Sequence, residues 1–299
     1  MNAILQPQTL NLAQQLADLA VQALLDEVRL SPKPALVDRR GSGAHQDLTL
    51  SMMEKSAHSL RPMFVAMSQA AIACGEISQT LRERIGQIGR DGEHTMLSVT
   101  DGVNTHRGAI WALGVLVTAT SVLPLGSTAE EICIAAGEIA QIEDVAWLRS
   151  QQHFNMQKSK PVLSHGQIVW QKHQKGGAKQ QAQMGFPAIR QDGLPQLHRT
   201  RQHSKREDFA QLDALLAIMQ YLDDSCVLYR AGPKGLTRMQ QGAAKVLALG
   251  GVANLQARRE LHLLEIDLLR MNASAGGAAD LLAATLFVDA VAHRFCSRI

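Results

Sequence analysis

The sequence is poor in aromatic residues and in cysteine, and several common catalytic motifs are missing from it. Only 4% of its 299 residues are aromatic. Its four cysteines, Cys74, Cys133, Cys226 and Cys296, lie far apart and form no CxxC pair. This spacing argues against a disulfide scaffold and a cysteine zinc site, and it predicts a protein of the reducing cytoplasm. Walker, HExxH and nucleophile-elbow motifs are absent as well.

The sequence also lacks the features of a signal peptide and of a membrane anchor. The stretch 9–28 carries Asp18, Asp26 and Glu27, and no basic region precedes it. The longest apolar run, 109–125, is interrupted by glycine and proline and is at the short limit for a bilayer span. We therefore expect a buried core helix there, in a soluble protein with no membrane contact.

Alternating Val, Ile and Thr segments long enough for a central sheet are missing, whereas strong helix formers are abundant. An amphipathic stripe of Leu and Ala runs over 12–24. Further helices are expected at 46–60, 62–74, 78–88, 103–123, 129–150, 207–229, 235–249, 252–271 and 278–295. The predicted fold is all-α, with one compact multi-helix domain over residues 1–299.

Residues 151–206, called the basic segment below, differ in composition from the rest of the chain. The segment has a net charge of +9, whereas the remainder has −6. It is either a binding surface for a polyanion or a solvated insertion. We expect a loop-rich, partly irregular excursion from the helical domain. Its cations are Lys158, Lys160, Lys172, Lys175, Lys179, Arg190, Arg199, Arg201, Lys205 and Arg206.

Four polar clusters interrupt the helical pattern, and the first combines Lys33, Asp38, Arg39, His45 and Asp47 on a loop that opens a helix. Amides at a helix start can hold an anion, and the two aspartates can hold a hard cation such as Mg²⁺. The alternative is that Asp47 complements a helix dipole and that Asp38 forms a surface pair with Arg39.

The second cluster, 101–110, directly precedes the most apolar helix. Asn104 or Thr105 is expected to cap this helix. A cap does not account for the adjacent His106 and Arg107, which lie at the polar end of a buried element, where charged groups meet substrates.

The third cluster, 221–230, places Asp223 and Asp224 inside an apolar helix. Carboxylates are costly there unless they are exposed, paired or metal-bound. Adjacent helical residues point about 100° apart, so we expect one of the two to face the interior. Arg230 ends this cluster.

The fourth cluster contains Ser274, Gly276 and Gly277 ahead of Asp280. Paired glycines allow a ligand to approach the backbone closely, and Ser274 with the following amides can hold a phosphate. The alternative is an ordinary capped helix start with Asp280 at the positive end of the dipole. Together the four clusters favour a phosphorylated, metal-bound ligand, but they do not define a reaction.

These strings resemble the triphosphoribosyl-dephospho-CoA synthase family, and they follow the family order over about residues 27–290. The stretch 224–230 looks more like the malonate decarboxylase branch of the family than the citrate lyase branch. The matching strings are Lys33-Pro34 through Asp47, Gly102 through Ala109, Ser164-His165-Gly166, Gly185-Phe186-Pro187, Asp223-Asp224, Tyr229-Arg230 and Gly276 through Leu282.

The resemblance implies an enzyme that converts ATP and 3′-dephospho-CoA into 2′-(5″-triphosphoribosyl)-3′-dephospho-CoA and adenine. The product would be the prosthetic-group precursor for the acyl carrier subunit of malonate decarboxylase. Mg²⁺ is the expected cofactor, and the two nucleotides are the expected partners. We expect no nucleic acid partner. The sequence is compatible with a homo-oligomer, and direct contact with the acyl carrier subunit is unproven.

Under this resemblance, each candidate residue receives a hypothetical role. Catalysis is assigned to His45, Asp47, His106, Asp223 and Asp224, and the metal to Asp38, Asp47, Asp224 and Asp280. Nucleotide binding is assigned to Lys33, Asp38, Arg39, Asn104, Thr105, Arg107, Lys179, Arg230, Ser274, Gly276 and Gly277.

The chain departs from the family pattern at one place. The family usually has Gly-Ala-Arg-Gly-Glu-Ala ahead of its Gly-Phe-Pro, whereas this chain has Lys179 and Gln181 at the charged positions. Lys179 keeps a cation without the planar fork of arginine, and Gln181 lacks a charge. If this pair binds substrate or metal, activity would be reduced or absent; if it only orients the basic segment, the change would be tolerated.

Two other classes of function fit part of the pattern. A helical nucleic-acid-binding module would use the basic segment, but stacking aromatics are scarce there. A nucleoside or ADP-ribosyl hydrolase would use the same carboxylates with water as the acceptor. A third alternative is a degenerate family member that binds substrate without turnover.

Overall fold

The computed structural model describes residues 7–149 and 165–295, and in these two ranges the chain forms helices joined by loops, with no β-strand. The prediction of an all-α fold is therefore confirmed. The helices are α1 (Pro7–Arg29), α2 (Leu50–Ser59), α3 (Arg61–Cys74), α4 (Gln79–Val99), α5 (Arg107–Val122), α6 (Ala129–Gln141), α8 (His165–His173), α9 (Gly177–Gln183), the π-helical η1 (Ala188–Gly193), α10 (Leu194–His203), α11 (Glu207–Tyr221), α12 (Ser225–Ala248), α13 (Leu255–Arg270) and α14 (Gly276–Phe295).

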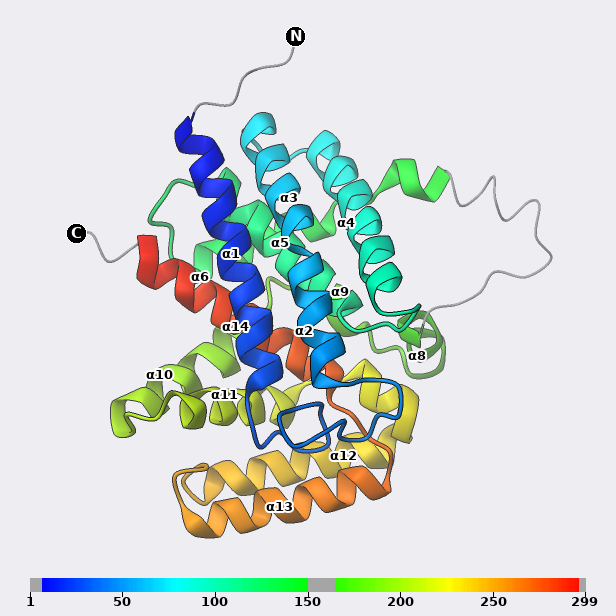
Figure 1. The fold of residues 1–299 in the computed structure, drawn as a ribbon, viewed down its shortest axis with the longest axis vertical. Coiled ribbons are helices and arrows are strands. Elements are labelled where there is room, and N and C mark those ends of the chain that lie inside the picture. Colours follow the sequence, from blue (N-terminus) through cyan, green and yellow to red (C-terminus); the bar gives the residue numbers. More distant parts are fainter. Residues whose placement is uncertain (1–6, 150–164, 296–299) are drawn as a thin grey trace, which may run out of the picture.

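Helix α5 forms the centre of one continuous hydrophobic core, packed against α1, α3, α4, α6 and α14 (Figure 1). Twelve of its sixteen residues are buried, which confirms the predicted core helix. Among the described residues, α14 is the only helix long and apolar enough to cross a membrane. Because 67% of its apolar window is buried inside the protein, α14 is better explained as a second core helix.

Helices α12 and α13 pack side by side as a hairpin at one end of the molecule, and α11 packs against α12 (Figure 1). The long connection between α1 and α2, residues 30–49, lies over this hairpin. Arg40 in the connection forms an ion pair of 2.6 Å with Glu265 on α13. The end of α1 is thereby held close to the start of α12 and of α14.

Short polar signals in the sequence determine where several helices begin and end. The side chain of Ser78 caps α4 by accepting from the Leu81 amide, and Thr128 forms a capping box with Glu131 at the start of α6. Helix α3 ends at Gly75, whose φ of 72° is readily adopted by glycine.

Several predicted boundaries were wrong. Helix α2 begins at Leu50 rather than at residue 46, because Thr49 caps it, and α4 continues to Val99. Helix α6 ends at Gln141, short of the predicted residue 150. The predicted helix 207–229 is broken at 222–224, where Asp224 caps a new helix. Helix α12 then runs past residue 235, with non-helical backbone at the glycine before Pro233.

The described part of the basic segment is more helical than its composition predicted. Helices α8, α9, η1 and α10 cover most of residues 165–203. Besides their charged side chains, these helices carry apolar side chains that pack into the hydrophobic core. This packing stabilises the folded form of the segment. Lys158 and Lys160 lie outside the described residues. The buried apolar residues are Val169, Ala182, Phe186, Ala188, Ile189, Leu194 and Leu197.

Candidate active site

The end of α1 and the starts of α5, α12 and α14 bring together polar residues that are far apart in the sequence (Figure 1). Five of these residues, Glu27, Lys33, His106, Asp224 and Asp280, are called the helix-end cluster below. All but Asp280 are buried, and Asp280 is partly buried. Charged groups in such a position need a partner or a ligand.

Lys33 and Glu27 form a buried ion pair. The Lys33 Nζ lies 2.5 Å from Glu27 Oε1 and donates a second hydrogen bond of 2.6 Å to the Glu27 carbonyl oxygen. Lys33 is only 1% exposed. Sequence reasoning assigned Lys33 to the nucleotide and did not select Glu27. The only available signal was its position in the last turn of α1, just before the first polar cluster.

Asp38 organises the loop that follows. Its carboxylate accepts hydrogen bonds from the Ser31 hydroxyl, from the backbone amides of Lys33 and Arg40, and from Arg40 Nε. Burial opposes ionisation of Asp38, but these hydrogen bonds hold its pKa below the usual value. The surface pair expected with Arg39 is wrong: the partner is Arg40, and Arg39 is exposed. Metal binding by Asp38 stays a prediction, which these contacts do not favour.

His106 precedes the first turn of α5, with one ring nitrogen engaged and one free. Its Nδ1 lies 2.7 Å from the hydroxyl of Ser56, which also bonds Thr105 at 2.6 Å. Its Nε2 is buried and has no hydrogen-bond partner among the described residues. Burial and then the nearby charge of Lys33 lower the pKa of His106 to about 4. The ring is therefore neutral at pH 7, and the hydrogen-bonding capacity of Nε2 is unused among the described residues.

Asp224 caps α12 and also contacts the start of α14. Its carboxylate accepts from the amides of Cys226 and Val227 on α12 and of Ala278 on α14. Burial raises its pKa, although these amides oppose the shift. Asp223 points outward and pairs with Lys175 at 2.6 Å. The expectation that only one of the two aspartates faces the interior is confirmed.

The paired glycines at the start of α14 allow two side chains of the protein, Asp224 and Cys226, to approach the backbone closely. A Cβ at Gly277 would lie 3.0 Å from the Asp224 carboxylate, and a Cβ at Gly276 would lie 3.1 Å from Cys226 Sγ. Both contacts are tighter than ordinary van der Waals packing. Asp224 can therefore reach the first amides of α14. The predicted role of these glycines in nucleotide binding stays a prediction.

Asp280 lies one turn into α14 and faces the start of α5. A Cβ on Gly108 would be 2.0 Å from Asp280 Oδ2, so a side chain at position 108 would displace the Asp280 carboxylate. Burial, and then the negative charges of Glu27 and Asp224, raise the pKa of Asp280 well above its usual value. Three acids thus share the helix-end cluster with one lysine. Such an excess of buried negative charge favours binding of a cation.

His45 and Arg230 connect the first, third and fourth polar clusters to one another through hydrogen bonds. His45 Nε2 lies 2.7 Å from the Ser274 hydroxyl, and its Nδ1 lies 3.5 Å from the exposed Asp47. Arg230 donates hydrogen bonds to the carbonyl oxygen of residue 44 and to Asn272. Burial and then the Arg230 charge lower the pKa of His45, while Asp47 opposes the shift.

The remaining candidates lie outside this group or serve local structure. The expectation that Asn104 or Thr105 is the N-cap of α5 was wrong, because His106 occupies that position, although the Asn104 side chain accepts from the Arg107 amide. The Arg107 side chain pairs with Glu93 on α4. Lys179 is exposed on α9. The Gln181 side chain accepts from the Ala188 amide at 3.2 Å and thereby holds the turn between α9 and η1.

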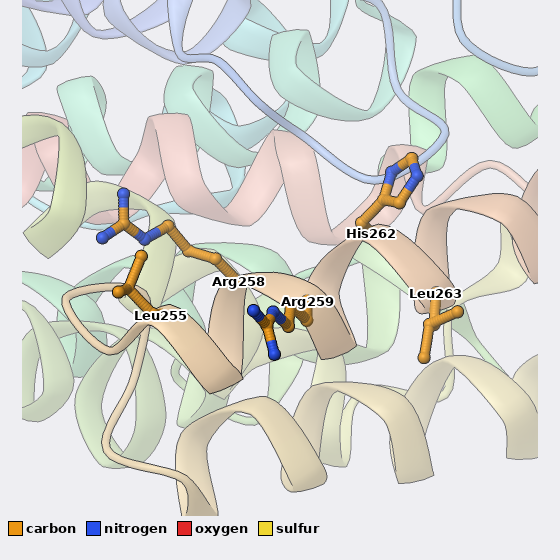
Figure 2. A pocket seen from close by; sticks show the side chains of 5 residues that line it. All are labelled: Leu255, Arg258, Arg259, His262 and Leu263. Atoms are coloured by element: carbon orange, nitrogen blue, oxygen red, sulfur yellow. The ribbon is translucent and has the colours of Figure 1, made fainter.

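An open pocket on the outer face of α13 contains none of the candidate residues (Figure 2). Arg258, Arg259 and His262 line it together with Leu255 and Leu263. Its lining comes from a single helix, and the carboxylates of the helix-end cluster take no part in it. The geometry of the helix-end cluster, rather than this pocket, defines the candidate active site.

Comparison with known proteins shows the family of this chain. A family model described as ATP:dephospho-CoA triphosphoribosyl transferase matches residues 13–298. The chain belongs to this family. It is similar to proteins named "Probable 2-(5''-triphosphoribosyl)-3'-dephosphocoenzyme-A synthase" from Pseudomonas fluorescens (strain Pf0-1) and Stutzerimonas stutzeri (strain A1501). The first is 53% identical over 96% of this chain and 95% of the relative, and the second is 54% identical over 97% and 96%. No solved structure gives a significant match.

Proposed function

We propose that this protein transfers the 5-triphosphoribosyl group of ATP to the 2′-hydroxyl of 3′-dephospho-CoA and releases adenine. Family membership supports the proposal at the level of the enzyme class. The observation that supports the chemistry is the meeting of Asp280, Asp224 and the unpartnered Nε2 of His106 at the ends of three helices.

The reaction breaks the bond between C1′ of the ribose and adenine, so positive charge develops on the sugar. The buried carboxylate of Asp224, whose negative charge lies close to that of Asp280, would stabilise this charge. The stabilisation is mutual: the positively charged sugar favours the ionised form of the acids, and the ionised acids favour the positively charged sugar.

The same donor set fits Mg²⁺, which prefers carboxylate oxygens. Glu27 and Asp280 would hold the ion, since the oxygens of Asp224 and Asp38 already accept several backbone hydrogen bonds. When bound, Mg²⁺ would neutralise charge on the triphosphate. Of the four aspartates that the sequence offered as metal ligands, this proposal keeps only Asp280, and it adds Glu27 as a second ligand.

His106 would accept the proton of the attacking 2′-hydroxyl at Nε2. Its Nδ1 bond to Ser56 fixes the ring, and its low pKa keeps it neutral. A base with such a low pKa is weak, which suits a reaction in which the bond to adenine breaks early. His45, between Ser274 and Asp47, would be the second acid–base group and would donate to the departing base.

The second substrate carries a pyrophosphate, and the nearest part of the basic segment can attract it. Lys175 pairs with Asp223 next to the first residue of α12, and α8 packs against α12. Lys172 and Lys179, on α8 and α9, are exposed and would contact the anion.

The stretch 224–230 favours a product that is used by malonate decarboxylase. Another enzyme would transfer this product to the acyl carrier subunit.

The test is incubation of the protein with ATP and Mg²⁺, with and without dephospho-CoA. Adenine is measured by chromatography and the nucleotide product by mass spectrometry. We expect adenine only with the acceptor, together with a product that has gained the triphosphoribosyl group. Adenine formed equally without the acceptor would indicate the hydrolase, and no adenine under either condition would indicate a degenerate member.

Two histidine variants link the product to the site. His106→Ala should lower adenine release by about 10²-fold or more, whereas His58→Ala, which changes an exposed histidine on α2, should leave it unchanged. Circular dichroism checks that both variants remain helical. Equal turnover of the two variants would remove His106 from the mechanism.

A further inference from the structure

A group of side chains of the types that bind metals connects α10 to the end of α14, away from the helix-end cluster. His198 comes from α10, and Asp289 and His293 lie one turn apart on α14. Their ligand atoms all lie within 4.8 Å of one another. Asp289 is nine residues after Asp280, so the two sites are separated by about 13 Å along α14. The proposed reaction uses none of the three residues.

The distances in this group are close to those that a bound metal requires. Asp289 Oδ1 lies 2.7 Å from His198 Nε2 and 3.5 Å from His293 Nε2. Ligand atoms bound to one Zn²⁺ at about 2.0–2.2 Å are roughly 3.3–3.6 Å apart in tetrahedral geometry. Small rotations of the two rings would therefore create the site. Both rings can rotate, because the histidine side chains are 53% and 69% exposed.

Neighbouring groups fix Asp289 in an orientation suited to a metal ligand. Its side chain is only 7% exposed, and its other oxygen, Oδ2, accepts from Arg201 at 2.7 Å. Arg201 is in turn held by Glu207 through two hydrogen bonds. The arginine fixes the carboxylate with Oδ1 turned toward both imidazoles, as outer hydrogen bonds commonly orient metal-binding carboxylates.

We propose that His198, Asp289 and His293 bind a divalent transition-metal ion of the Zn²⁺ type. Two imidazoles and one carboxylate suit such an ion better than Mg²⁺, which prefers oxygen ligands. Three protein ligands leave coordination positions for water. The ion joins α10 to α14 and thereby attaches the basic segment to a core helix, which is a structural role separate from the transfer reaction.

The test uses the full chain without an affinity tag, stripped of metal by a chelator. Zn²⁺ is titrated in competition with a chromophoric chelator, and Co²⁺ is used as a spectroscopic probe of the ligands. We expect one site, a higher melting temperature with Zn²⁺, and Co²⁺ absorption bands typical of nitrogen and oxygen ligands.

Matched variants separate a metal site from a simple hydrogen-bonded pair. His198→Ala and His293→Ala should each lower Zn²⁺ affinity by at least about 10-fold, and the double variant should lose the melting-temperature shift. His203→Ala, an exposed histidine on the same helix α10, is the control and should bind normally. The proposal is overturned if the wild type binds Zn²⁺ no more tightly than the double variant. Both histidines are exposed, so loss of folding does not complicate the comparison.

Discussion

The helix-end cluster and the basic segment use charge in opposite ways. In the cluster, three acids and one lysine are gathered by helix ends, and the pKa values of Asp224 and Asp280 are raised because burial disfavours their ionised forms. In the basic segment, several cations are already neutralised by nearby acids, as Arg190 is by Glu130. A high net charge in sequence therefore overstates the charge free to bind a ligand. A few buried charges without full compensation indicate a ligand site more strongly.

The first way to test this comparison is to remove one of the uncompensated acids. Asp280→Asn keeps the shape and an oxygen that can accept from the Ala109 amide, but it removes the negative charge. We expect turnover to fall by about 10²–10³-fold. The free energy of unfolding without ligand should rise by on the order of 1 kcal/mol at pH 7, because a buried charge is gone. Adenine release and denaturant unfolding measure the two effects.

Lower turnover together with a higher free energy of unfolding in Asp280→Asn would indicate that the acid serves to bind a cation. Mg²⁺ should raise the melting temperature of the wild type but not that of Asp280→Asn. Asp267→Asn changes an acid on α13 that pairs with Arg238 of α12; it serves as the control and should retain turnover. Loss of stability in Asp280→Asn together with normal turnover would contradict the assignment.

The pH dependence of stability provides the second test. The pKa of His106 is about 4 in the folded protein and 6.5 ordinarily, so between these values the unfolded chain binds a proton that the folded chain does not. The His106 contribution to stability is therefore fully present above pH 6.5 and is lost as the pH falls toward 4. The total change is on the order of 3 kcal/mol. Asp224 and Asp280, with raised pKa values, act in the opposite direction as the pH falls.

Comparison with His106→Asn isolates this contribution, because asparagine does not titrate and its amide can still bond Ser56. We expect the difference in unfolding free energy between the wild type and the variant to change between pH 4 and 6.5 and to be constant above it. Urea unfolding at several pH values measures this difference. Parallel pH curves for the two proteins would show that the pKa of His106 is not lowered in the folded state.

The positions of the polar clusters could be read from the sequence, whereas the partners within them could not. The all-α fold and the buried helix α5 were readable from composition and periodicity, because helix propensity and apolar patterning are local properties. Partners such as Glu27 with Lys33, or Gly108 with Asp280, depend on how helices pack, and no local pattern encodes that. Arg39 and Arg40 are equally basic neighbours, yet only Arg40 is turned toward Asp38 and Glu265.

The helix break at 222–224 illustrates the same limit and supplies the third test. Asp224→Ala leaves the first amides of α12 and of α14 without their acceptor, so we expect a loss of about 2 kcal/mol of stability and loss of turnover. Asp224→Asn, which keeps one acceptor oxygen, should be intermediate. Asp223→Ala removes an exposed side chain and should change stability by about 0.5 kcal/mol or less. Equal destabilisation by the two alanine variants would contradict the buried cap.

The smallest expected effect concerns the cations of the basic segment that have no ion-pair partner among the described residues. Lys172 and Lys179 lie on α8 and α9, beside the start of α12, whereas Arg199 and Lys205 lie on and after α10. Replacing the first pair by serine should raise the KM for dephospho-CoA by roughly 3-fold to 10-fold and weaken its dependence on salt. The same change at Arg199 and Lys205 should leave the KM unaltered. Since both double variants remove two positive charges, equal effects would mean that net charge rather than position attracts the second nucleotide.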